Sequence, residues 1–147
     1  EKGIRGGTEN VAAIAAMATA LNNSITSMNN TTLFLNKLTE HFLALLDDSK
    51  IKYSINGSTQ NRLPGHISIS FPGKSGEALL HQLDLKGIYV STGSACDSVR
   101  TETSHVLQAI KLPEKLAKGT IRITFGENNS IYDAEAIAIA LISSLKK

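Results

Sequence analysis

The residue best suited to chemistry is Cys96, the only cysteine in this chain of 147 residues. It follows Gly93-Ser94-Ala95, which have little side-chain bulk, in a predicted loop after the apolar run Ile88-Tyr89-Val90. A thiolate in such a loop can reach a substrate and act as a nucleophile. A lone loop cysteine can equally be incidental, and spacing alone does not separate the two interpretations.

Arg122 is the second informative residue. Ile121, Ile123 and Phe125 alternate with Arg122 and Thr124, so a strand here places the arginine on the polar face. A guanidinium at this position is suited to clamp a carboxylate through two hydrogen bonds. The alternatives are a solvated sheet face and an internal ion pair.

A third candidate is the stretch Arg5-Gly6-Gly7-Thr8 before a predicted helix, where Thr8 is the expected N-cap. Backbone N–H groups, a hydroxyl and the positive end of a helix together favour an anion such as a phosphate. A capped helix without a ligand is the simpler alternative. The four histidines have no metal-ligand spacing, so we expect no metal site and assign them structural or surface roles; they are His41, His66, His81 and His105.

Hydrophobic periodicity predicts the elements that position these residues. The polar patch 29–32 is expected to separate the first two helices. The order of predicted helices and strands along the chain indicates an α/β (α+β two-layer) fold, with helices covering a small antiparallel or mixed sheet. The predicted helices are 11–28, 33–48, 77–85, 105–110 and 134–145, and the predicted strands are 51–55, 66–71, 88–91 and 121–125.

Composition narrows the classes of function. A length of 147 residues suits one domain. A net charge of +2, 5% aromatic residues and no tryptophan argue against nucleic-acid binding. No window approaches the roughly 20 uninterrupted apolar residues of a membrane span. One cysteine cannot form an internal disulfide, which fits a reducing compartment, and we expect a cytoplasmic protein.

A series of short motifs, in order along the whole chain, resembles the C-terminal part of the NifS/IscS-type cysteine desulfurases. These enzymes belong to aminotransferase class V and are fold-type I pyridoxal-phosphate enzymes. The Gly-Ser-Ala-Cys loop resembles the branch with the long cysteine loop. The motifs are Arg5-Gly6-Gly7-Thr8-Glu9-Asn10-Val11, Leu63-Pro64, Ser70-Phe71-Pro72-Gly73, Gly76-Glu77-Ala78-Leu79-Leu80, Leu83-Asp84, Gly87-Ile88, Val90-Ser91-Thr92-Gly93-Ser94-Ala95-Cys96, Ser104-His105-Val106-Leu107 and Ile121-Arg122-Ile123.

The resemblance implies conversion of L-cysteine to L-alanine, with a persulfide left on the enzyme. It implies that Cys96 is the nucleophile, that Arg122 holds the substrate α-carboxylate, and that Thr8 reaches the cofactor phosphate of the partner subunit in a homodimer. It also implies sulfur-acceptor proteins, such as an iron–sulfur scaffold. Asp97 departs from the family, in which a small hydroxyl residue is usual here, and a carboxylate beside a thiol raises the thiol pKa.

The family's Schiff-base lysine lies upstream of the matched region, and this chain has no His-Lys pair. Lys74 is interpreted as a surface lysine. We therefore expect residues 1–147, which begin at Glu1, to be the C-terminal small domain of a longer enzyme and inactive alone, with residues 1–30 linking it to a pyridoxal-phosphate-binding large domain. The alternative is a stand-alone sulfur-relay or partner-docking domain of desulfurase ancestry.

Overall fold

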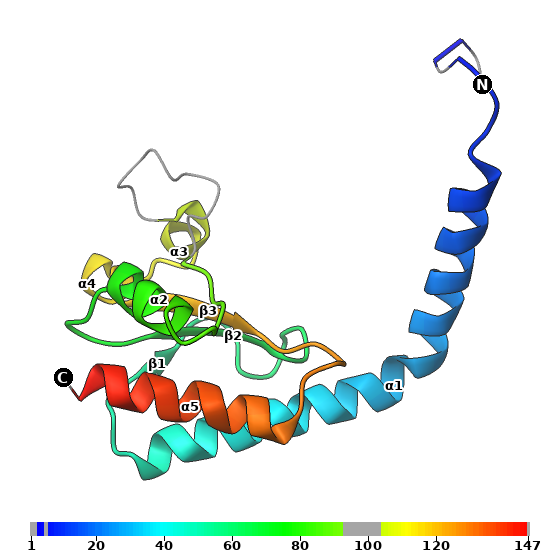
Figure 1. Cartoon of the computed structure of the whole chain (residues 1–147). Coiled ribbons are helices and arrows are strands. Elements are labelled where there is room, and N and C mark those ends of the chain that lie inside the picture. The colour runs from blue at the N-terminus through cyan, green and yellow to red at the C-terminus, as the bar shows by residue number, and fades with distance from the viewer. Residues whose placement is uncertain (1–2, 5, 93–103, 147) are drawn as a thin grey trace.

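The computed structural model describes residues 3–4, 6–92 and 104–146. Figure 1 shows a small sheet with a long helix on one side, whose N-terminal half extends away from the rest of the molecule. The elements are α1 (Val11–Asp48), β1 (Ser54–Ile55), β2 (His66–Ser70), α2 (Gly76–Asp84), α3 (His105–Ala109), α4 (Glu114–Ala117), β3 (Thr120–Thr124) and α5 (Ile131–Leu145).

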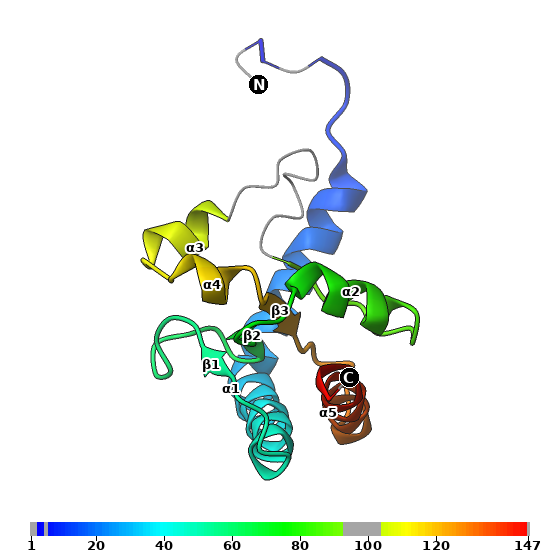
Figure 2. The ribbon, with the colours of Figure 1, turned by 90° about the vertical axis from the view of Figure 1, so that its left-hand side faces the viewer.

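The three strands form one antiparallel sheet in the order β1-β2-β3. Ile67 pairs with Ile123 and Ile69 with Ile121, so the apolar side chains of both strands share one face. On this face the C-terminal half of α1 and α5 run side by side (Figures 1 and 2). This arrangement confirms the predicted fold class, and the sheet is antiparallel.

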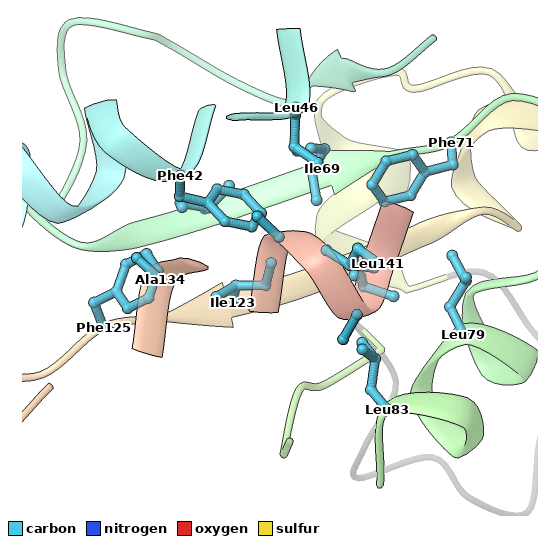
Figure 3. Packing of buried hydrophobic residues seen from close by; sticks show 14 of the residues in the cluster. Phe42, Leu46, Ile69, Phe71, Leu79, Leu83, Ile123, Phe125, Ala134 and Leu141 are labelled. Atoms are coloured by element: carbon cyan, nitrogen blue, oxygen red, sulfur yellow. The ribbon is translucent and has the colours of Figure 1, made fainter. Parts of the chain in front are cut away.

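The hydrophobic core lies between this apolar face and the helices α1, α2 and α5 (Figure 3). Phe42 of α1 meets Phe125 edge to face, with ring centroids 6.1 Å apart. Leu141 of α5 is fully buried in the same cluster. Burial of a side chain of this size stabilises a fold by about 1.5–3 kcal/mol, so the core holds the sheet firmly against the helices.

Two of the predicted helices are in fact one. The helix α1 continues through residues 29–32, and the prediction of a break there is wrong. The patch contains asparagine and threonine, which lower helix propensity only slightly, and neither glycine nor proline. Threonine hydroxyls within α1 bond to the carbonyl four residues earlier, for example Thr26 to Asn22 at 2.8 Å.

Several smaller predictions are corrected. The N-cap of α1 is Asn10, whose side chain accepts from Ala13 N at 3.1 Å, and not Thr8. The strand predicted over 88–91 is reduced to one bridge at Ser91. The helix α5 begins three residues earlier than predicted, because Ser130 and Asp133 form a capping box. The short helix α4 was not predicted.

The N-terminal half of α1 carries an exposed apolar stripe. Its side chains are 53–68% exposed in the structure. By length and composition alone, α1 could cross a membrane: one 18-residue window has mean hydropathy 1.2, and none of it is buried here. The stripe consists of Val11, Ile14, Met17, Leu21, Ile25 and Met28.

Candidate functional site

Arg122 lies in the middle of β3, on the face of the sheet opposite to the core. Its strand neighbours Ile121 and Ile123 are buried, whereas Arg122 is exposed. The predicted alternation is therefore confirmed. Because the guanidinium is exposed, it avoids the desolvation cost of a buried charge.

Serines flank Arg122 on both sides. Ser68 of β2 is its direct cross-strand partner. Ser91 forms an isolated antiparallel bridge with it, in which Ser91 N donates to Arg122 O at 3.0 Å and Arg122 N donates to Ser91 O at 2.6 Å. The segment that leads to Cys96 is thus joined to β3 at the residue predicted to bind a carboxylate.

The Arg122 guanidinium forms no ion pair with any residue that the structure describes. Within that part of the chain, the alternative of an internal ion pair is therefore wrong. A guanidinium has five N–H donors in a planar fork, which matches the two oxygens of a carboxylate. The group is thus placed to bind an anionic ligand that approaches the polar face.

Two further basic side chains lie near Arg122. His66 is paired with Thr124 on the same face. Burial lowers the pKa of His66, and the nearby charges of Arg62 and Arg122 lower it further. The Arg62 guanidinium is held by hydrogen bonds from Nε to Ser58 O and from Nη2 to Asn56 O, both 2.8 Å. This end of the polar face is consequently electropositive.

The other end of the polar face is a buried hydrogen-bond network. Asn56 Nδ2 donates to Ser68 Oγ at 3.2 Å and to Ser70 Oγ at 2.8 Å. Ser70 Oγ lies 2.7 Å from Thr120 Oγ1, which donates to Leu116 O at 3.0 Å. These bonds fix the position of Ser68 next to Arg122.

The sequence interpretation missed this network. The period-two pattern of β2 places Ser68 and Ser70 opposite Ile67 and Ile69, and that signal alone identifies a polar face. Asn56 directly follows the predicted strand 51–55, and the sequence pattern assigns it no partner. Its contact with Ser68 depends on the register between β1 and β2, which the pattern does not specify.

Cys96 lies outside the described residues, as does Arg5. The described chain ends at Thr92, one residue after the bridge, and resumes at Ser104, which is buried and is the N-cap residue of α3. The two ends of this segment are therefore anchored in the domain.

Thr8 is exposed and precedes the N-cap of α1 by two residues. The N-terminal end of α1 extends away from the sheet (Figure 1). The structure therefore does not bring Thr8 and Arg122 together.

The remaining candidates have structural or surface positions. His41 Nε2 lies 3.0 Å from Glu135 Oε1 and joins α1 to α5. Exposed Lys74 donates from Nζ to Leu145 O, at the end of α5, over 2.7 Å. No group of three or more metal-ligating side chains occurs in the described part of the chain.

Comparison with known proteins identifies the class to which this chain and its fold belong. The sequence matches the family model described as aminotransferase class-V over residues 1–137, and the chain belongs to that family. Within the family its relatives are cysteine desulfurases, which confirms the resemblance inferred from the motifs.

The chain is 44% identical over 126 residues to cysteine desulfurase IscS of Dictyoglomus turgidum, covering 86% of this chain and 32% of that protein. It is 34% identical over 149 residues to cysteine desulfurase IscS of Clostridium botulinum, covering 100% of this chain and 38% of that protein. The X-ray structure of a NifS-like protein from Rickettsia africae superposes with a TM-score of 0.82 at 30% identity. The match covers 99% of this chain and 38% of that protein. The chain thus spans between 32% and 38% of the length of these relatives.

Proposed function

We propose that this chain is the C-terminal portion of a pyridoxal-phosphate-dependent cysteine desulfurase, which converts L-cysteine to L-alanine. The similarity to IscS proteins supports the reaction class. The share of those proteins that it covers supports a longer parent polypeptide, which supplies the rest of the active site.

The observation that carries this proposal is the bridge between Ser91 and Arg122. Arg122 presents a guanidinium that pairs with no carboxylate in the described part of the chain and is suited to an amino-acid carboxylate. Cys96 follows Ser91 by five residues, a length of chain that spans at most about 18 Å. A carboxylate-binding group and a nucleophile are therefore tethered to the same point of the sheet.

The proposed chemistry balances without an external oxidant or reductant. The Cys96 thiolate attacks the sulfur of bound L-cysteine, an S–S bond forms, and the C–S bond of the substrate breaks. The electron pair of the broken bond stays on carbon, which takes up a proton and becomes the methyl group of alanine. The sulfur remains on Cys96 as a persulfide for transfer to an acceptor. The reactive form is the thiolate, so the rate follows the pKa of Cys96.

The chain's own residues fit only a small part of a cofactor site. Thr8 is an exposed hydroxyl near the N-terminal end of α1, where helix N–H groups favour a phosphate. We propose that Thr8 contacts the phosphate of pyridoxal phosphate in the partner subunit of a homodimer. When bound, this cofactor withdraws electrons from the substrate carbon and so labilises its bonds.

The decisive experiment uses the polypeptide that contains this chain, loaded with pyridoxal phosphate. We expect it to release one alanine for each sulfur transferred from L-cysteine. Cys96→Ala abolishes sulfur transfer, while Lys52→Ala, at an exposed site on the approach to β1, leaves it unchanged. Alanine formation that survives in Cys96→Ala at the wild-type rate, together with sulfide release, would remove Cys96 from the reaction.

The alternative of a sulfur relay is separated by intact-mass measurement. The full protein incubated with L-cysteine should gain one sulfur atom on Cys96. If the mass increase needs a second desulfurase as donor, the relay interpretation replaces the enzyme.

We also propose that residues 1–147 are the C-terminal small domain and that the exposed stripe on α1 packs against the large domain. Met17 is one of its exposed apolar members, and Asn23 lies on the opposite side of the helix. In the parent polypeptide, Met17→Asp should cost about 1.5–3 kcal/mol of unfolding free energy, the value of a buried side chain. The matched change Asn23→Asp should cost little.

Equal effects of the two variants would show that no protein surface covers the stripe. Sedimentation with phospholipid vesicles then tests whether a membrane covers it. We further propose a cytoplasmic location, because the mechanism needs Cys96 as a free thiol. The proposed acceptor is an iron–sulfur scaffold or a similar sulfur carrier.

A further inference from the structure

Ser68 occupies a distinctive position in the row of side chains that crosses the sheet at Arg122. The row consists of Asn56, Ser68, Arg122 and Ser91. Asn56 N donates to Ser68 O at 2.9 Å, and Ser68 is the cross-strand partner of Arg122. Ser91 forms the bridge with Arg122 on its other side. Directly opposed residues in an antiparallel pair have Cβ atoms about 4.5–5.5 Å apart. The Ser68 hydroxyl and the root of the Arg122 side chain are therefore neighbours on one face.

The hydrogen bonds of Ser68 leave its proton available. Ser68 Oγ accepts from Asn56 Nδ2 at 3.2 Å. The Ser68 hydroxyl donates to no acceptor among the residues that the structure describes. By contrast, the Ser91 hydroxyl on the other side of Arg122 donates to Thr92 O at 3.0 Å. Of these two flanking serines, Ser68 is the one with a free donor.

The free donor is also held in place. The Asn56 side chain is buried and its amide bonds to both Ser68 and Ser70. Ser70 is anchored in turn by Thr120 at 2.7 Å. Because Asn56 approaches the Ser68 oxygen as a donor, it turns the Ser68 proton away from itself. A preorganised donor loses less entropy when it binds a ligand than a freely rotating one.

We propose that Ser68 is a second carboxylate-binding residue, which donates a hydrogen bond to the α-carboxylate that Arg122 binds. This rests on the proposed function, since it takes the carboxylate of the amino-acid substrate as the ligand. A carboxylate has about four lone-pair sites, so it can accept the guanidinium fork and one hydroxyl together. Two donors from adjacent strands fix the tilt of the carboxylate, which a single mobile arginine side chain does not.

The test uses the full cofactor-loaded protein and an isosteric pair of variants. Ser68→Thr keeps the hydroxyl, and Ser68→Val has the same shape without it. A hydrogen bond to a charged group contributes enough that its loss should raise KM for L-cysteine about tenfold in Ser68→Val. We expect kcat within about twofold of wild type, and KM of Ser68→Thr within about threefold.

A ligand without the carboxylate isolates the effect. Cysteamine has the thiol and amine of L-cysteine, so its inhibition constant should be the same in wild type, Ser68→Thr and Ser68→Val. Lys52→Ala is the control outside the polar network, because Lys52 is exposed and lies before β1. It should leave KM for L-cysteine within about twofold of wild type.

The outcomes separate this inference from the function on which it rests. A wild-type protein that forms no alanine from L-cysteine overturns both. An active wild type with equal KM in Ser68→Val and Ser68→Thr overturns the role of Ser68 alone. A tenfold loss that is equally large for cysteamine does the same, because it shows a structural effect and not carboxylate binding.

Discussion

Replacing Asn56 with alanine removes the centre of the buried polar network. Asn56 is 5% exposed; its Nδ2 donates to Ser68 Oγ at 3.2 Å and to Ser70 Oγ at 2.8 Å, and its Oδ1 accepts from Ser70 Oγ at 3.1 Å. Each hydrogen bond contributes about 0.5–1.5 kcal/mol net, so the three together contribute about 1.5–4.5 kcal/mol. Ser70 keeps its bond to Thr120 and is not left wholly unpaired, which limits the penalty. With the lost packing of the amide included, the expected cost is about 2–3 kcal/mol.

The assay is equilibrium unfolding in urea followed by circular dichroism, with thermal melts in parallel. For a domain of about this size, the expected loss corresponds to a fall in Tm of about 4–12 °C. The matched control is Asn61→Ala, because Asn61 is exposed and its side chain takes part in none of the hydrogen bonds above; it should change stability by less than about 0.5 kcal/mol. A loss below about 0.5 kcal/mol for Asn56→Ala, or an equal loss in both variants, would refute the claim that the network stabilises the sheet.

Three other predictions follow from the same geometry. A Cβ at Gly119 would collide with the carbonyl oxygens of the segment 71–74, so Gly119→Ala should cost about 1–3 kcal/mol in urea unfolding, whereas Gly126→Ala, which meets only an ordinary contact, should be nearly neutral. Equal stability of the two variants would contradict the close contact between Gly119 and the segment 71–74. Arg122→Gln should raise the pKa of His66 toward its ordinary value of 6.5, because it removes a nearby positive charge that disfavours the imidazolium. A titration of the His66 ring by NMR measures this pKa. An unchanged pKa would show that the Arg122 guanidinium does not lie close to the His66 ring. Asp133 accepts hydrogen bonds at the start of α5, mainly from a backbone N–H, which lowers its pKa below the ordinary 3.8. The folded state therefore favours the carboxylate, and the stability that Asp133→Asn loses at about pH 7 should shrink as the pH falls below about 4 and through the lowered pKa of Asp133. A difference that is equally large at neutral pH and in acid would exclude this origin.

The core was predictable from local patterns. Alternation in 121–125 and 66–71 correctly assigned which side chains face the helices, since side chains on a strand alternate between two faces regardless of what lies next to them. The same rule put Arg122 on the polar face. The predictions that were wrong concern where helices and strands begin and end. The patch 29–32 resembled a break, but neither proline nor glycine interrupts it, and α1 continues because its C-terminal half is held in the core.

The polar face shows the limit of sequence reasoning. Asn56, Ser68 and Ser91 lie at separations of 12 and 23 residues along the chain, and no local pattern links them to one another or to Arg122. Strand pairing alone aligns them, because register depends on how the strands pack against α1 and α5.

By itself, the order of residues determined the class of protein, the two-layer fold, the thiol at Cys96 and the side of the strand from which Arg122 projects. These follow from motif spacing and from a two-residue period, which are local properties of a chain. The tertiary structure alone decided that the Ser68 hydroxyl lies on the same face of the sheet as the Arg122 side chain, and that no described part of the chain covers the apolar stripe of α1. Both depend on which segments distant in the sequence come into contact. Those contacts are determined by the free energy of packing the complete fold.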